Sequence, residues 1–116
     1  MKRLLWFFVA AAPLAFAAEP GKPDWKSLDT TLEPGKAIEH CDALEKGEKR
    51  RYHWKSSAPV DFNVHYHQEQ EVFYPVKRDA MRGDGGTFVA KAGQEYCWMW
   101  TARNAPARLE AQVESR

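Results

Sequence analysis

Apolar and polar residues alternate with a period of two along most of the chain. Between residues 60 and 67, Val, Phe, Val and Tyr alternate with Asp, Asn, His and His. Successive side chains of a strand point to opposite faces, so this pattern predicts strands with one buried face each. The predicted strands span residues 37–41, 49–55, 60–67, 71–76, 87–91, 93–100 and 107–114.

Turn residues separate most of these segments. Gly47, Pro59, the glycines within 83–86 and Gly93 stand between the apolar runs. About seven short strands with turns between them predict an all-β, antiparallel β-sandwich or barrel. Pro75 cannot donate a ladder hydrogen bond, so its strand is expected at an edge or at a bulge.

The stretch 93–100 (GQEYCWMW) reads as a central strand, because it concentrates three large aromatic side chains. Tyr96, Trp98 and Trp100 share one face of this strand, whereas Cys97 and Met99 share the other. Either face is a candidate for the interior. The residues expected in the core are Tyr52, Phe62, Val64, Phe88, Leu109 and Val113, and those expected at least partly exposed are His65, His67, Arg108 and Glu110.

The first 18 residues have the features of a secretory signal peptide. A basic start precedes an apolar run, and the run ends in small residues, which predicts cleavage after Ala17 or Ala18. We expect residues 19–34 to form an extended leader and residues 35–116 to form one β-sandwich domain. The product is expected to be periplasmic or secreted, with no membrane span after cleavage.

Two cysteines, Cys41 and Cys97, lie in the exported part. An oxidising compartment favours a disulfide between them. A two-thiol metal site or a redox pair is the alternative, although the Cys-x-x-Cys spacing of redox pairs is absent.

Four segments resemble the GOLD (Golgi dynamics) domain, the lumenal β-sandwich of eukaryotic cargo receptors. They are AIEHC (37–41), VDFNV (60–64), GGTFVA (85–90) and GQEYCWMW (93–100). The chain departs from the family pattern in that Tyr96 directly precedes Cys97. The resemblance implies a GOLD-like antiparallel β-sandwich with a Cys41–Cys97 bridge, and it does not extend to cargo transport, since a fold does not fix a function.

His65 and His67 form the clearest candidate site. Residues i and i+2 of a strand point to one face, so both imidazoles can reach one transition-metal ion, copper before zinc. A third donor is required, and the candidates in order are Met99, His53 and Glu71. The alternative is a pair of ordinary surface histidines.

Other chemistry is weaker in the sequence. Trp54, Trp98 and Trp100 are candidates for a carbohydrate-binding platform, although the same residues are needed to fill a small core. No catalytic motif is recognisable, so we expect no enzyme, and the formal net charge of +1 gives no indication of nucleic acid. The leading hypothesis is a small exported binding module for an envelope protein or other ligand; a periplasmic metal-binding protein and a purely structural accessory domain are the alternatives.

Overall fold

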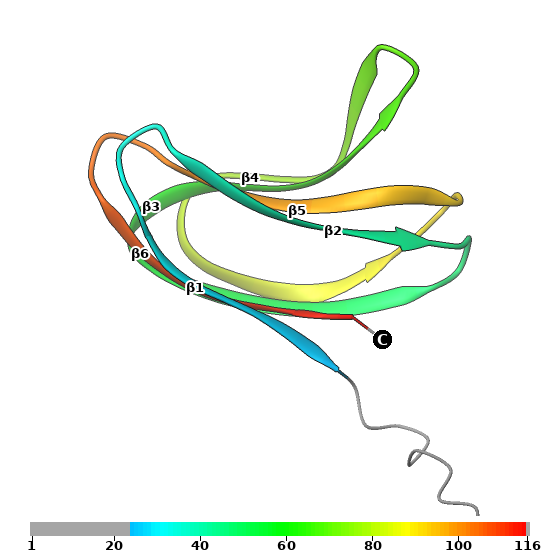
Figure 1. Ribbon diagram of the computed structural model, residues 1–116, viewed down its shortest axis with the longest axis horizontal. Coiled ribbons are helices and arrows are strands. Elements are labelled where there is room, and N and C mark those ends of the chain that lie inside the picture. The colour runs from blue at the N-terminus through cyan, green and yellow to red at the C-terminus, as the bar shows by residue number, and fades with distance from the viewer. Residues whose placement is uncertain (1–23, 116) are drawn as a thin grey trace, which may run out of the picture.

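The chain forms six antiparallel strands in the computed structural model, which describes residues 24–115 (Figure 1). The strands are β1 (Trp25–Leu32), β2 (Ala37–Leu44), β3 (Lys49–Gln68), β4 (Glu71–Val89), β5 (Gln94–Ala102) and β6 (Ala107–Glu114). The all-β prediction is confirmed, with six strands instead of about seven. Residues 24–115 contain no helix that is long and apolar enough to cross a membrane.

Two long strands, β3 with 20 residues and β4 with 19, each take part in both layers of the fold. The first half of β3 pairs with β6 and its second half pairs with β5, while β4 follows β3 along its whole length. One layer is therefore β1-β6-β3-β4 and the other is β2-β5-β3-β4. If each half of β3 and β4 is counted separately, this connectivity is that of an eight-stranded jelly roll.

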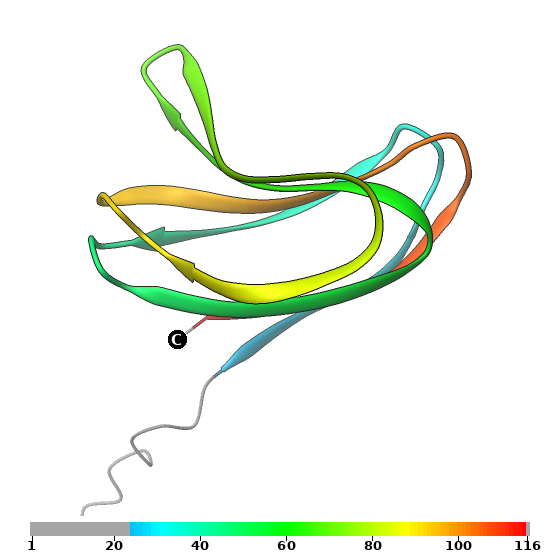
Figure 2. The same cartoon turned by 180° about the vertical axis from the view of Figure 1, so that it is seen from behind.

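The breaks predicted at residues 57–59 and 83–86 are wrong, because both strands continue through them. The two strands bend together from one layer into the other, and Figure 2 shows this shared curve from behind. The bend falls where the β3–β4 register shifts, between Lys55 and Val60 and again before Phe62. Gly83 and Gly85 do not form a turn; they allow β4 to pack closely against β3. A Cβ added at Gly83 would lie 3.1 Å from the Trp54 carbonyl oxygen, and one added at Gly85 would lie 3.2 Å from the Tyr52 carbonyl oxygen.

The core lies between the two layers and is rich in aromatic residues. The even-numbered side chains of β3 point inward and meet Tyr96, Trp98 and Trp100 of β5. The Phe62 ring lies at the centre, with centroids 5.3–5.4 Å from the rings of three aromatic neighbours. All six residues predicted for the core are buried: Tyr52, Phe62, Val64, Phe88, Leu109 and Val113.

The carbohydrate platform expected from Trp54, Trp98 and Trp100 is wrong, because all three side chains are buried in this core. A domain of this size buries its largest apolar side chains to obtain enough stabilising contact area. These tryptophans therefore stabilise the fold and leave no indole face for a sugar.

The disulfide between Cys41 and Cys97 is present, as predicted. The two residues are direct neighbours on β2 and β5, with their Cα atoms 4.0 Å apart. The bridge projects from the outer face of its layer, opposite to Trp98. The interior face of β5 is therefore the aromatic one.

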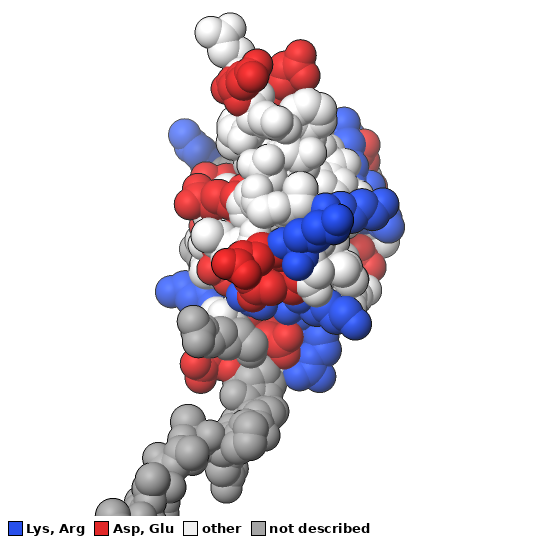
Figure 3. All heavy atoms as spheres, turned by 90° about the vertical axis from the view of Figure 1, so that its right-hand side faces the viewer, with Lys and Arg blue, Asp and Glu red and all other residues white. Residues whose placement is uncertain are grey.

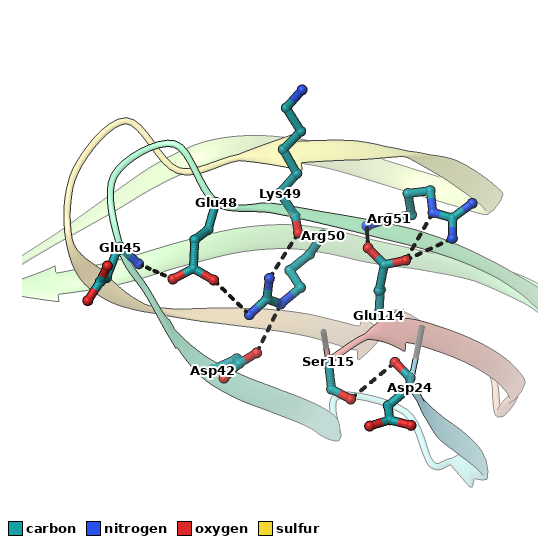
Figure 4. A network of polar contacts seen from close by, with 9 residues as sticks. All are labelled: Asp24, Asp42, Glu45, Glu48, Lys49, Arg50, Arg51, Glu114 and Ser115. Carbon is teal, nitrogen blue, oxygen red and sulfur yellow. Dashed lines mark hydrogen bonds and ion pairs between the residues drawn. The ribbon is translucent and has the colours of Figure 1, made fainter. Parts of the chain in front are cut away.

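Salt bridges tie the layers together near one end of the core (Figure 4). Arg50 is buried on β3, and its Nε lies 3.2 Å from an Asp42 carboxylate oxygen on β2, in the other layer. The same guanidinium contacts Glu48 and donates to the Lys49 carbonyl oxygen. A buried charge is tolerated only with such partners, so the network fixes this end of the sandwich.

The sheet begins at Trp25, earlier than the expected domain start near Gly35. β1 pairs with β6 along its full length, and Leu32 is buried in the core. Part of the expected leader is therefore an edge strand. The predicted signal peptide and residues 19–23 lie outside the described residues.

Candidate functional site

The histidine pair lies on the outer face of the β2-β5-β3-β4 layer. On this face, the side chains of cross-strand neighbours form two adjacent rows. Glu39, Met99 and Asn63 form one row, and the Cys41–Cys97 bridge and His65 form the next. The site is thus assembled from three strands that are distant in sequence.

The end of the β3–β4 hairpin shapes this face. Between Val64 and Tyr66, the pairing register shifts by one extra residue on β4, which places a bulge at Tyr74 and Pro75. Beyond the bulge, the hairpin turns away from both layers (Figure 1). The prediction that Pro75 lies on an edge strand or at a bulge is confirmed on both counts, since β4 pairs only with β3 among the described strands.

His65 is 4% exposed, so the expectation that it is at least partly exposed is wrong. The strand alternation was read correctly, and His65 does point away from the core. Its burial comes from neighbours on the outer face: the ring centroids of His67 and Tyr74 lie 5.3 Å and 5.9 Å from its own. His67 itself is exposed, as expected.

The two ring nitrogens of His65 have different surroundings. Nδ1 lies 2.6 Å from Oδ1 of Asn63, and Nε2 lies 3.6 Å from Oε2 of Glu39. An amide oxygen accepts only, so Nδ1 carries the proton and donates it, which leaves a lone pair on Nε2 of the neutral ring. Burial lowers the pKa of His65, the Glu39 carboxylate opposes this shift, and His67 adds to it.

The three candidate third donors have different positions. Met99 lies on the same face, directly opposite Asn63 and Glu39. His53 is on the half of β3 in the other layer, with its ring 5.5 Å from that of Trp25. Glu71 pairs with Gln68, and alternation directs this pair to the face opposite His67 and Val72. His53 and Glu71 are therefore wrong as partners of His65.

Sequence reasoning missed Glu39, whose carboxylate faces His65. The only local signal for Glu39 was its place two residues before a cysteine. Its position beside His65 depends on the register of β2 on β5 and of β5 on β3, which the alternation pattern alone does not give.

A second feature is an exposed apolar surface on the same hairpin and at the end of β4. The large apolar side chains exposed among the described residues are Val72, Phe73, Tyr74 and Val89, all on β4. Phe73, Tyr74 and Val89 border a cleft of about 470 Å³ at the open edge between the two halves of β4. Val72 lies outside the cleft, at the position paired with His67. The cleft is lined by Tyr66, Phe73, Tyr74, Pro75, Val76, Thr87, Phe88, Val89, Lys91, Ala92 and Tyr96.

Figure 3 shows this end of the molecule. Acidic side chains lie at the top, an uncharged area lies beneath them, and a band of mixed charge follows. Phe73 is 38% exposed and Tyr74 is 48% exposed. The Phe73 ring stacks on Tyr66, with the centroids 5.2 Å apart, so the exposed surface continues into the core.

Comparison with known proteins identifies the fold and no family. No protein-family model matches the chain, and no curated protein matches it. The resemblance to the GOLD domain therefore has no support from a family match.

Two solved structures share the architecture. The mitogen derived from Yersinia pseudotuberculosis (YPM) has a TM-score of 0.59 at 8% identity, over 81% of this chain and 86% of the other. PliG of Aeromonas hydrophila, a periplasmic inhibitor of g-type lysozyme, has a TM-score of 0.50 at 12% identity, over 80% of this chain and 86% of the other. At these identities, the similarity establishes a common β-fold.

Proposed function

We propose that this chain is a small exported binding module that holds a partner protein of the cell envelope at the β4 edge. The observation that carries the proposal is the gathering of Phe73, Tyr74 and Val89 around a cleft on one edge strand, with Val72 exposed beside them on the hairpin. Exposed apolar patches with polar surroundings are typical of interaction sites. The proposed role is binding without catalysis.

The extent of the surface favours a protein over a small molecule. A cleft of about 470 Å³ accommodates one or two large side chains. Val72 and Tyr74, however, lie on the hairpin that extends beyond both layers. A ligand that covers both the hairpin and the cleft has the dimensions of a protein surface.

The geometry also restricts the mode of binding. Within residues 24–115, β4 has no strand partner along one edge, but Pro75 lacks an N–H donor and the bulge beside it interrupts the ladder. Continuous addition of a partner strand is therefore disfavoured. We expect the partner to insert an apolar side chain into the cleft, as anchor residues do at protein interfaces.

Two further points support this function. The disulfide fits an oxidising compartment and agrees with the predicted signal peptide. One structural neighbour is a periplasmic inhibitor that acts on another protein, and another is a mitogen.

The first experiment uses a photo-crosslinking amino acid in the cell envelope of the producing organism. We expect an adduct with one protein when the probe replaces Val89, an exposed residue that lines the cleft, and no such adduct when it replaces Thr31. Thr31 is an exposed strand residue of β1, outside the hairpin and the cleft, and serves as the matched control.

Direct binding of the purified adduct partner then decides the proposal. Val89→Asp places a charge beside the cleft and is expected to weaken binding at least about tenfold, because a charge in an apolar contact is left unpaired. Thr31→Asp introduces the same charge elsewhere and should leave the affinity unchanged. Equal affinities for both variants, or adducts of equal yield at both positions, would reject the β4 edge as the binding surface.

A further inference from the structure

The buried ring of His65 places Nε2 3.6 Å from a carboxylate oxygen of Glu39, and in the neutral ring with the proton on Nδ1 this nitrogen carries a lone pair. Nδ1 donates to the Asn63 oxygen at 2.6 Å, so the lone pair of Nε2 points toward Oε2 of Glu39. Two acceptors that face each other repel unless a cation lies between them. The arrangement uses none of the residues that line the apolar cleft, although Tyr74 of the cleft packs against the His65 ring at 5.9 Å between centroids.

The distance between the two atoms fits a bridging metal ion. At 3.6 Å, Nε2 and Oε2 are too far apart for a hydrogen bond. Zinc–nitrogen and zinc–oxygen bonds of about 2.0–2.2 Å span that separation at an angle of roughly 110–130° at the metal, close to tetrahedral. The present side-chain positions therefore leave room for one ion between them.

The support around His65 is of the kind that orients metal ligands. A ligating histidine usually donates its other ring N–H to an oxygen, which fixes the tautomer and the ring plane. Asn63 supplies that oxygen and is itself buried, as is His65. The side of the site toward solvent is open, because Glu39 and His67 are exposed.

His67 completes the donor set. Its ring centroid is 5.3 Å from that of His65, and as an exposed side chain it is free to rotate toward the same point. Met99 lies in the row beside His65 and offers a thioether to softer ions. The sulfurs of Cys41 and Cys97 are joined in the disulfide and are not thiolate ligands.

We propose that Glu39, His65 and His67 bind one divalent transition-metal ion on the outer face of the β2-β5-β3-β4 layer. Two imidazoles and a carboxylate suit zinc(II) and copper(II), and they do not suit magnesium or calcium, which prefer oxygen ligands. Water completes the coordination.

The test is calorimetric titration of the disulfide-bonded protein with zinc chloride, and separately with copper(II) chloride. The expected result is one ion per chain for the wild type and for His53→Ala. His53 is an exposed histidine in the other layer and controls for adventitious imidazole binding. Glu39→Gln keeps the shape of the exposed side chain but removes the carboxylate charge, and it should weaken metal binding at least about tenfold. At known metal sites, the loss of a group that merely hydrogen-bonds to a ligand already has an effect of this size.

His65→Ala should abolish the site, and a nitrogen-detected NMR spectrum of the imidazoles provides a measurement that does not depend on this variant folding. On addition of zinc to the wild type, the Nε2 resonance of His65 should shift while Nδ1 keeps its proton. No binding by the wild type, equal affinity in Glu39→Gln, or a loss of binding in His53→Ala would each overturn the proposal.

Discussion

Replacing both cysteines with alanine should destabilise the protein by about 4 kcal/mol. The bridge joins residues separated by 56 positions. In the chain-entropy relation, closing a loop of that length removes about 14 cal/mol/K from the unfolded chain, which is about 4 kcal/mol at 25 °C. Replacing the pair avoids the free thiol that a single substitution would leave.

The structure locates this effect mainly in the unfolded state. Cys41 and Cys97 are already neighbours in the β2–β5 ladder, and the bridge lies outside the aromatic core. The folded variant should therefore keep its strand pairing. The unfolded variant should be more expanded, which raises the slope of the unfolding free energy against denaturant.

Urea unfolding followed by tryptophan fluorescence measures both quantities, since Trp54, Trp98 and Trp100 are buried. The double variant Cys41→Ala/Cys97→Ala should show a lower unfolding free energy, a steeper slope and a mainly slower folding rate. A loss of unfolding free energy below about 1 kcal/mol would refute the chain-entropy account. A loss of the predicted size would also refute it if the variant mainly unfolded faster and the denaturant slope stayed unchanged.

The bulge at residues 79–80 gives two further predictions. Ala80 has a φ of +53°, which is unfavourable for a residue with a Cβ, so Ala80→Gly should stabilise the protein by up to about 1 kcal/mol in thermal unfolding. Ala43→Gly, at an exposed strand position without positive φ, should destabilise the protein. If both glycine substitutions changed the stability in the same direction, backbone strain at Ala80 would be contradicted. Burial raises the pKa of Asp61, but the Ala80 N–H and Arg103 outweigh it, so the pKa lies below its usual value. The Asp61 carboxylate therefore stabilises the fold above about pH 4 and ceases to do so as the pH falls through its folded pKa. The wild type should be more stable than Asp61→Asn at pH 7, and this difference should disappear at acid pH. A stability difference that does not change with pH would contradict the role of the Asp61 carboxylate.

The alternation of side chains was sufficient to predict much of the fold. Residues 60–67 and 107–114 show period two, and the inward positions of both segments are buried as expected, except that Tyr66 is half-buried. The pattern could not show that β3 and β4 continue through Pro59 and the glycines at 83–86. Proline and glycine favour turns locally, but here they allow bulges and close strand contact at a shared bend.

The candidate sites depended on contacts that the sequence does not encode locally. The His65–His67 pair was evident from its spacing. Glu39 and Asn63 join it only through strand register and rotamer, and the burial of His65 follows from the bend of the hairpin. The apolar cleft was missed because Phe73 and Val89 belong to segments that were read as separate strands.

The central claim is that the hairpin end of β4 is the binding surface, and chemical-shift mapping tests it most directly. The partner recovered by crosslinking is added to the ¹⁵N-labelled protein, and the amide resonances are followed by NMR. We predict that the largest shifts fall within residues 73–76, 87–89, 91 and 92, which line the cleft. Shifts concentrated on β1 and β6, with the cleft unaffected, would contradict the claim.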